Sequence, residues 1–316
     1  MTAPLLDLRA FIAARERIAP YVPQTPLIGL ASGLRVKAES LTAIGAFKIR
    51  GAFNALLTLS ADQKAAGVVA HSSGNHAQAV AFAAAALGIR AVLVMPANAP
   101  ATKVAGVRRC GGEIVLVGPT SAERAAKADD LATSKGLTLV PPFNHLAIMA
   151  GTGTIGLELL DQAPGLTTVY APVSGGGLLG GLAAAIKLSR PAVRVIGCEP
   201  ELAADAFASF QAGEIVSVTD EEAQRTAADG LRVRRLGDLT WPHIRAFVDD
   251  IVTVTEAAMF DAMRTLAFEG RLVAEPSGAV SIAAALADRA GEGAVAILSG
   301  GNIDPGAYAA ILTGES

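Results

Sequence analysis

The stretch from Thr168 to Gly180 reads TVYAPVSGGGLLG and decides the class of fold. It starts as a short apolar run typical of a buried strand, passes through three glycines, and continues into an alanine-rich segment typical of a helix. Strand, glycine loop and helix in this order form the repeating unit of α/β proteins with parallel sheets. Because glycine lets the backbone approach a ligand closely at a helix N-terminus, the loop is also a candidate phosphate site.

The same stretch lies within residues 162–186, which carry no charged side chain and are long enough to span a membrane. Pro164, Pro172 and the glycine cluster would break a lone spanning helix. We therefore interpret these residues as a strand, a tight loop and a new helix.

Apolar runs of strand length alternate with alanine-rich helical stretches along the whole chain. The predicted strands cover residues 67–70, 91–95, 114–117, 168–173, 194–198 and 294–298. Thr120 and Glu123 predict a capping box for a helix that ends near Gly136, and the helix expected over 75–87 stops at Gly88. This pattern is typical of mainly parallel, twisted sheets flanked by helices. We expect two domains: a smaller one over residues 57–144, inserted into a larger one formed by 1–56 and 145–316.

The composition is that of a folded enzyme with a small-molecule partner. Of the 316 residues, 52% are hydrophobic and 17% are charged, and the formal net charge is -3. These values give no indication of nucleic acid or an anionic membrane as a partner. Residues 1–11 include Asp7 and Arg9 and lack the basic start and apolar core of a secretory signal, so we expect a cytoplasmic protein.

A second candidate anion site is Ser72-Ser73-Gly74-Asn75-His76, which follows an apolar run and opens an alanine-rich helix. Backbone N–H groups and hydroxyls converge at such a helix start, and a substrate carboxylate fits there. An ordinary helix cap gives the same pattern, so this loop alone identifies no ligand.

Lys48 lies in an apolar, glycine-flanked segment, Gly45-Ala46-Phe47-Lys48-Ile49-Arg50-Gly51. Burial penalises the charged form of a lysine, and the neutral amine attacks an aldehyde to form a Schiff base. Pyridoxal phosphate is the obvious aldehyde. However, Gly175, Gly177 and Gly180, with Glu199 beyond them, also satisfy the fingerprint of a dinucleotide site. We favour pyridoxal phosphate because two anion loops and a candidate Schiff-base lysine occur together.

Together with Ser299-Gly300-Gly301-Asn302 after the last strand, these segments resemble the fold-type II pyridoxal-phosphate enzymes, which share the tryptophan synthase β-like fold. They are most similar to the serine racemase and threonine (serine) dehydratase family. The resemblance starts at Pro23-Gln24-Thr25-Pro26-Leu27 and includes Ala228-Asp229-Gly230 and Leu239-Thr240-Trp241-Pro242. It covers nearly the whole chain.

The resemblance implies a role for each motif. Lys48 would hold the cofactor as a Schiff base, with Phe47 beside it, Asn75 on the ring hydroxyl and Ser299 on the ring nitrogen. The phosphate is expected on Ser174, Gly175, Gly176, Gly177 and Leu178. The substrate carboxylate is expected on Ser72, Ser73, Gly74, Asn75 and His76.

The implied activity is a β-elimination that converts a β-hydroxy amino acid, such as L-threonine or L-serine, into a 2-oxo acid and ammonia. Ser73 matches the acid/base that serves racemases on the opposite face of the substrate, so a serine racemase is the alternative. A cysteine-synthase-like β-replacement enzyme is a second alternative. A pyridoxal-phosphate-binding protein without catalysis would need an unreactive Lys48. The resemblance also implies a homodimer.

Glu199, Ala203 and Asp205 repeat the spacing at which relatives hold Mg²⁺, Ca²⁺ or Mn²⁺ through two carboxylates and a backbone carbonyl. Two acidic residues six positions apart are otherwise typical of a solvated face. We expect a divalent cation here, with a structural or activating role.

The chain departs from the family pattern near the lysine. The family usually has Gln, Thr and Ser where this chain has Thr42, Ile44 and Ala46, and a Gln where Thr152 stands. These differences replace polar side chains with smaller or more apolar ones. We hypothesise that the site accepts a β-hydroxy amino acid other than serine or threonine, for example phenylserine or 3-hydroxyaspartate.

Overall fold

The computed structural model describes residues 4–72, 74–99 and 101–315. Its strands are β1 Leu27–Gly29, β2 Arg35–Ala38, β3 Val68–His71, β4 Ala91–Pro96, β5 Glu113–Val117, β6 Thr138–Leu139, β7 Thr168–Pro172, β8 Arg194–Pro200, β9 Asp250–Val254 and β10 Ala294–Leu298. Its α-helices are α1 Leu8–Ile18, α2 Lys48–Leu57, α3 Ala61–Ala66, α4 Asn75–Ala86, α5 Ala101–Arg109, α6 Ser121–Lys135, α7 Leu146–Gln162, α8 Gly177–Ser189, α9 Asp205–Ala212, α10 Asp220–Ala223, α11 Thr240–Phe247, α12 Glu256–Thr265, α13 Pro276–Ala287 and α14 Pro305–Thr313. Short helical turns are η1 Glu39–Leu41, η2 Glu201–Ala203, η3 Asp229–Leu231 and η4 Leu266–Gly270.

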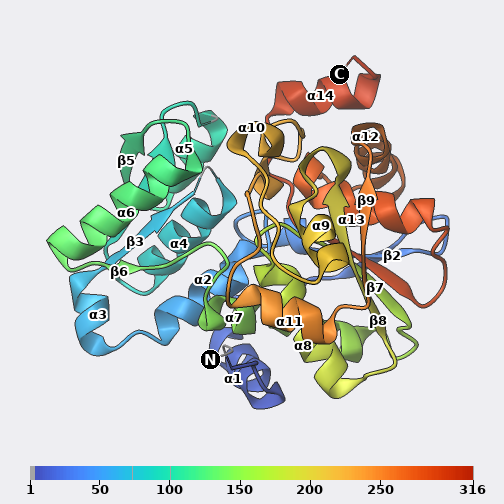
Figure 1. The fold of residues 1–316 in the computed structure, drawn as a ribbon, viewed down its shortest axis with the longest axis horizontal. Coiled ribbons are helices and arrows are strands. Elements are labelled where there is room, and N and C mark those ends of the chain that lie inside the picture. The colour runs from blue at the N-terminus through green and yellow to red at the C-terminus, as the bar shows by residue number, and fades with distance from the viewer. Residues whose placement is uncertain (1–3, 73, 100, 316) are drawn as a thin grey trace.

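The strands form two separate sheets. The larger sheet has the order β1-β2-β10-β7-β8-β9, and the smaller one has the order β5-β4-β3-β6. Figure 1 shows the smaller sheet with its helices on the left and the larger sheet on the right. Among the strand pairs of the described residues, only β1 with β2 is antiparallel. The predicted α/β class with mainly parallel sheets is therefore confirmed.

The smaller sheet uses only strands between residues 68 and 139. The domain limits placed at residues 57 and 144 stay a prediction. The six runs predicted as strands all form strands, with ends that differ by at most two residues. The strands that were not predicted are short or contain charged residues. Lys37, for example, is fully buried in β2, where it pairs with Glu158.

Local capping signals were read correctly from the sequence. Thr120 and Glu123 form the reciprocal capping box of α6, and Gly136 ends that helix with a φ of 65° in the left-handed region. Helix α4 ends just before Gly88, whose φ is 67°. The uncharged residues 162–186 form the end of α7, then β7, a loop and most of α8. Within the described ranges, no helix is both long and apolar enough to cross a membrane.

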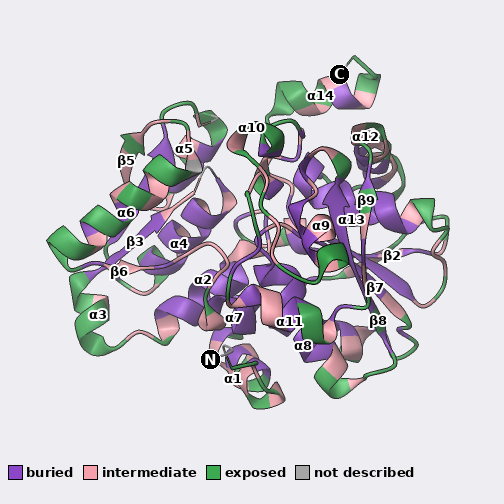
Figure 2. Cartoon of the chain, in the orientation of Figure 1, coloured by how far each residue is buried: buried purple, intermediate pink, exposed green. Residues whose placement is uncertain are grey.

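The centre of the larger sheet is covered on both sides. Helix α13 packs on β7, β8 and β10, while α8 packs on β7 and against α7 and α11. Figure 2 shows these central elements buried and the helices of the smaller sheet exposed on their outer faces. The α7 and α8 backbones approach closely at Gly181, where a Cβ would lie 2.3 Å from the Met149 carbonyl oxygen. Parallel strands buried on both faces present their carboxyl ends, and hence Ser174 and Ser299, at one edge.

Candidate active site

Lys48 is the first residue of α2 and lines a cavity of about 400 Å³. Its Nζ donates a hydrogen bond of 2.8 Å to the Pro142 carbonyl oxygen. The side chain is half-buried because it faces the cavity, yet the surrounding protein removes most water from the amine. Burial lowers the pKa of Lys48 from 10.5 to about 8. The neutral, nucleophilic amine is therefore well populated at weakly alkaline pH.

Two backbone contacts join the lysine segment to the loop after β10. The Phe47 N–H donates to the Ser299 carbonyl at 3.0 Å, and Ala46 pairs with Gly300 as an isolated antiparallel bridge. The Lys48 Nζ lies 5.1 Å from the centroid of the Phe47 ring, within the range of a cation–π contact. Segments near opposite ends of the chain thus meet at the predicted Schiff-base lysine.

The glycine loop begins after β7 and ends at the N-terminus of α8. A Cβ at Gly175 would lie 2.4 Å from the Phe143 ring. Gly176 has a φ of 90°, and a Cβ there would lie 2.7 Å from the Thr240 Oγ1. That hydroxyl donates to the Gly175 carbonyl at 2.7 Å. The glycines are therefore required both by the backbone conformation and by close packing. The N-terminus of α8 has no side-chain cap, so its N–H groups can bind an anion.

The second anion loop connects β3 to α4. The Gly74 N–H donates to the Ser72 Oγ at 3.1 Å, and both residues line the cavity. The His76 Nε2 lies 2.9 Å from the Val140 carbonyl, so this nitrogen carries the proton. Burial lowers the pKa of His76 to about 3, and the ring is neutral. Ser73 lies outside the described residues.

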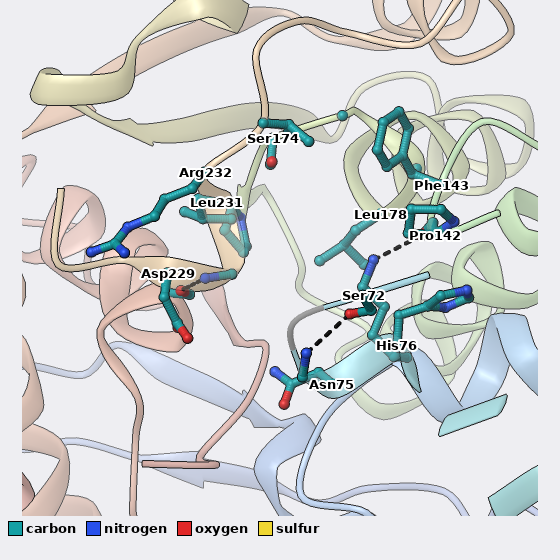
Figure 3. Close-up of a pocket in the computed structure, with 18 of the residues that line it drawn as sticks. Ser72, Asn75, His76, Pro142, Phe143, Ser174, Leu178, Asp229, Leu231 and Arg232 are labelled. Atoms are coloured by element: carbon teal, nitrogen blue, oxygen red, sulfur yellow. Dashed lines mark hydrogen bonds between the residues drawn. The ribbon is translucent and has the colours of Figure 1, made fainter. Parts of the chain in front are cut away.

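Figure 3 shows how the walls of the cavity are arranged. Ser72, Asn75 and His76 lie on one side, and Asp229, Leu231 and Arg232 lie across from them. Ser174 and Phe143 close the end next to the glycine loop. Ser299 also lines the cavity and is 5% exposed. The residues predicted from the sequence to bind one cofactor and one substrate are therefore gathered around one space, apart from the undescribed Ser73.

A buried polar cluster behind Asn75 was not predicted. The Asn75 Nδ2 donates to the Glu275 Oε1 at 2.5 Å, and the Asn302 Nδ2 donates to the Asn75 Oδ1 at 2.9 Å. The Lys103 Nζ pairs with Asp229 and lies 3.8 Å from the Glu275 Oε2. Burial, together with nearby Asp229, raises the pKa of Glu275 to about 7 although Lys103 acts in the opposite direction.

The sequence around Asp229, Glu275 and Lys103 gives little indication of this cluster. Asp229 belongs to the motif Ala228-Asp229-Gly230, for which the family resemblance implies no particular role. Glu275 stands just before Pro276, the first residue of α13, and this is the pattern of a helix start. Nothing in the neighbourhood of Lys103 distinguishes it from a surface lysine.

Comparison with known proteins decides which class of enzyme has this cavity. The family model described as "Pyridoxal-phosphate dependent enzyme" matches residues 18–300. The chain belongs to this family. The space between a reactive lysine and a glycine cradle at a helix N-terminus fits pyridoxal phosphate, with Lys48 for the aldehyde and the N-terminus of α8 for the phosphate.

Several relatives of this pyridoxal-phosphate-dependent enzyme match over nearly their whole length. A serine racemase of Oryza sativa subsp. indica is 42% identical over 315 residues, which cover 95% of this chain and 92% of that protein. An L-threo-3-hydroxyaspartate ammonia-lyase of Saccharomyces cerevisiae is 38% identical over 312 residues, which cover 96% and 95%. The solved structure of maize serine racemase has 39% identity and a TM-score of 0.92, with coverage of 99% of this chain and 98% of that one. A solved threonine deaminase has 44% identity and a TM-score of 0.89, with coverage of 95% and 99%.

The predicted cation ligands of this pyridoxal-phosphate-dependent enzyme lie at the end of β8 and the start of α9. Glu199 and Asp205 are both fully buried. The Glu199 oxygens accept hydrogen bonds from the Ala206 and Phe207 N–H groups at 3.1 and 2.8 Å. Both Asp205 carboxyl oxygens are buried without a hydrogen-bond partner within the described chain. Such orphaned hard oxygens fit a divalent cation.

The protonation of this acidic pair depends on burial. Burial raises the pKa of Asp205 to about 7, and burial together with the Asp205 charge raises the pKa of Glu199 well above its usual value. In the part of the chain that the structure describes, no three or more His, Cys, Asp or Glu side chains are grouped so that they could hold a metal ion by themselves. A cation would therefore need the Ala203 carbonyl or water as further ligands.

Proposed function

We propose that this pyridoxal-phosphate-dependent enzyme is an ammonia-lyase that dehydrates a β-hydroxy amino acid and releases a 2-oxo acid and ammonia. The observation that carries the proposal is the position of Lys48. Its amine, with a pKa lowered to about 8, lines the same cavity as the glycine loop and as Ser72 and Gly74. A base, a phosphate site and a carboxylate site are the groups that this reaction needs from the protein.

Bound pyridoxal phosphate supplies the aldehyde that joins the substrate amine and the conjugated ring that takes up the electron pair of the broken Cα–H bond. The protein supplies the remaining functions. Lys48 Nζ would accept the Cα proton, because a pKa lowered to about 8 makes the neutral amine available at weakly alkaline pH. The N-terminus of α8 holds the phosphate, and the loop that opens α4 orients the substrate carboxylate.

The Ser299 hydroxyl is the proposed partner of the ring nitrogen. It is buried, and its contact with the Ser277 carbonyl is long at 3.4 Å, so it can turn toward a better acceptor. A neutral hydroxyl does not hold that nitrogen protonated, unlike an aspartate. Ser299 would therefore leave the ring a weaker acceptor of electrons, which would favour elimination of the β-hydroxyl.

The names of the relatives support two activities. The yeast relative is an L-threo-3-hydroxyaspartate ammonia-lyase and one solved neighbour is a threonine deaminase, which support elimination and make hydroxyaspartate a candidate substrate beside threonine. The rice relative is a serine racemase, so racemisation is the second candidate. Racemisation needs a base on the other face of Cα, and Ser73 is the residue proposed for it.

One experiment separates these activities. Purified protein loaded with pyridoxal phosphate is incubated with L-serine, L-threonine, L-threo-phenylserine and L-threo-3-hydroxyaspartate, and both 2-oxo acid and the D-isomer are measured. Faster formation of 2-oxo acid supports the lyase, whereas faster formation of the D-isomer makes the protein a racemase. A clear preference for threonine would overturn the hypothesis of a different β-hydroxy substrate. Absence of a visible absorption band after loading would overturn the proposed function as a whole.

We further propose a divalent cation at Glu199, Ala203 and Asp205, a homodimer, and a cytoplasmic location. The buried, unpartnered oxygens of Asp205 support the cation. The dimer follows from the family resemblance, and sedimentation equilibrium of the loaded protein tests it. Fractionation of cells that express the chain tests the location.

A further inference from the structure

Glu275 is placed to act on the cofactor site through Asn75. It is the N-cap residue of α13, but its side chain makes no capping hydrogen bond to that helix. Its carboxylate instead accepts from the Asn75 Nδ2 at 2.5 Å and is 2% exposed. Gly300 leaves room for this contact, because a Cβ there would lie 2.2 Å from the Glu275 Oε1.

The direction of each hydrogen bond in this cluster follows from the Ile44 carbonyl, which can only accept. The Asn302 Nδ2 lies 2.8 Å from that oxygen, so the amide group of Asn302 is oriented with its NH₂ toward Ile44. The same NH₂ lies 2.9 Å from Asn75, which must then accept through its Oδ1. The Asn75 NH₂ consequently points to Glu275, which is an acceptor on that side.

This orientation determines what Asn75 can offer to the cavity that it lines. Its Oδ1 accepts from Asn302, and one N–H of its NH₂ is donated to Glu275. The NH₂ group has a second N–H. Neither of these contacts uses this second N–H, so it is the hydrogen bond that Asn75 can still donate to a ligand in the cavity. A donor stabilises the ionised form of a phenolic oxygen.

We propose that Glu275 and Asn302 are positioning residues that orient the Asn75 carboxamide so that it donates a hydrogen bond to the ring oxygen of the cofactor. This inference rests on the proposed function, in which the cavity holds pyridoxal phosphate. Lys103 and Asp229 are the charged groups that face Glu275, and the Lys103 Nζ lies 3.8 Å from its second oxygen. The carboxylate is thus held between Asn75 on one side and Lys103 on the other.

The test compares Glu275→Leu, which removes the acceptor, with Glu275→Gln, whose side-chain carbonyl can still accept from Asn75. Asp288→Asn is the matched control, because Asp288 pairs with the Tyr170 hydroxyl and does not line the cavity as described. Each metal-saturated apoprotein is titrated with 4′-deoxypyridoxine 5′-phosphate, which keeps the ring hydroxyl and phosphate but has no aldehyde. The ring-hydroxyl pKa of the bound probe is then followed by ultraviolet absorbance.

We expect Glu275→Leu to bind the probe about tenfold more weakly, the loss typical of one buried hydrogen bond, and to raise the pKa of its ring hydroxyl. Glu275→Gln and Asp288→Asn stay within about threefold of the unchanged protein. If Glu275→Leu does not fold, Asn302→Ala tests the same orientation with Glu275 intact and is expected to change both quantities in the same direction.

Two results would overturn the inference. One is an unchanged affinity and ring-hydroxyl pKa in Glu275→Leu or Asn302→Ala. The other is a loss in Glu275→Gln as large as that in Glu275→Leu, which would assign the effect to the negative charge. A failure of the proposed function can be distinguished from both results. In that case the unchanged protein would form no visible absorption band with pyridoxal phosphate itself.

Discussion

The Lys103 ammonium in α5 forms an ion pair with Asp229 in η3, which joins a helix beside the smaller sheet to an element that packs against α13, a helix that covers the larger sheet. The methylene chain of Lys103 also lies against the second anion loop. A Cβ at Gly74 would be 2.5 Å from the Lys103 Cδ. Burial lowers the pKa of Lys103, but Glu275 and Asp229 more than offset this effect and raise it overall. The Lys103 side chain therefore lies between the proposed carboxylate loop and η3 and sets the distance between them.

The first prediction concerns Lys103→Met, which keeps the chain length and removes the charge. We expect KM for the amino acid to rise about tenfold with a smaller change in kcat, because the loop that orients the carboxylate loses its charged anchor. Steady-state kinetics on the loaded protein check this. Lys127→Met is the control, since the Lys127–Asp130 pair is solvent-exposed. Equal KM values for Lys103→Met and the control would contradict the prediction.

Lys48→Ala should abolish 2-oxo acid formation, with a fall in kcat of about 10³-fold or more, because both the Schiff base and the proposed base are removed. Borohydride reduction of the loaded protein, followed by peptide mass spectrometry, should find the cofactor on Lys48 and nowhere on the variant. Lys64→Ala, in α3 and away from the cavity, should retain both the label and the activity. Substantial turnover by Lys48→Ala would remove Lys48 from the mechanism.

The pH dependence of cofactor capture follows from the pKa of Lys48. The neutral amine is the reactive form, so the rate at which apoprotein captures pyridoxal phosphate should rise with pH and level off above about 8. An ordinary lysine would show the same rise near its usual pKa of 10.5. Stopped-flow absorbance on apoprotein, beside Nα-acetyl-lysine as reference, measures the two curves. If the rate for the protein rises only at the pH at which the rate for the reference rises, burial does not lower the pKa of the Lys48 amine.

The acidic pair at Glu199 and Asp205 predicts an unusual dependence of stability on pH. Both pKa values are raised by burial, so the folded state binds protons more tightly than the unfolded chain does. In the absence of metal, this stabilisation is present at about pH 4 and is lost as pH rises toward and through about 7. Metal-free protein should therefore have a Tm that falls between these limits.

Addition of Mg²⁺, Ca²⁺ or Mn²⁺ at pH 8 should raise the Tm again, because the cation replaces the missing protons. Asp205→Asn should weaken the pH dependence and abolish the response to the cation. Thermal denaturation followed by circular dichroism checks both statements. If none of the three ions raises the Tm of the unchanged protein, the proposed cation site is wrong.

The parts of the fold and the site that were predicted depend on neighbours in the sequence. The glycine loop before α8, the capping box of Thr120 and Glu123, and the lysine among apolar residues are local patterns, and their physical meaning does not depend on the rest of the chain. Parallel strands such as β7 and β10 are mostly apolar and carry no charged residue, so the same reasoning identifies them.

The parts that were not predicted depend on partners far along the chain. Strand β2 contains Lys37, and only its ion pair with Glu158 makes a buried lysine acceptable there. The role of Glu275 likewise depends on its contacts with Asn75 and Lys103, which lie in other elements. A hydrophobic pattern contains no information about such pairings. Residues of buried polar clusters are therefore the hardest to predict from the sequence.

Strand β10 lies between β2 and β7 in the larger sheet although it follows both by more than a hundred residues in the sequence. During synthesis, β2 and β7 must therefore wait with unpaired edges until residues 294–298 have left the ribosome. Exposed edges of this kind favour aggregation, so the nascent chain is vulnerable for most of its translation. The same insertion brings Ser299 to Phe47, so the proposed cofactor site cannot form before residues 294–299 have reached their place in the sheet.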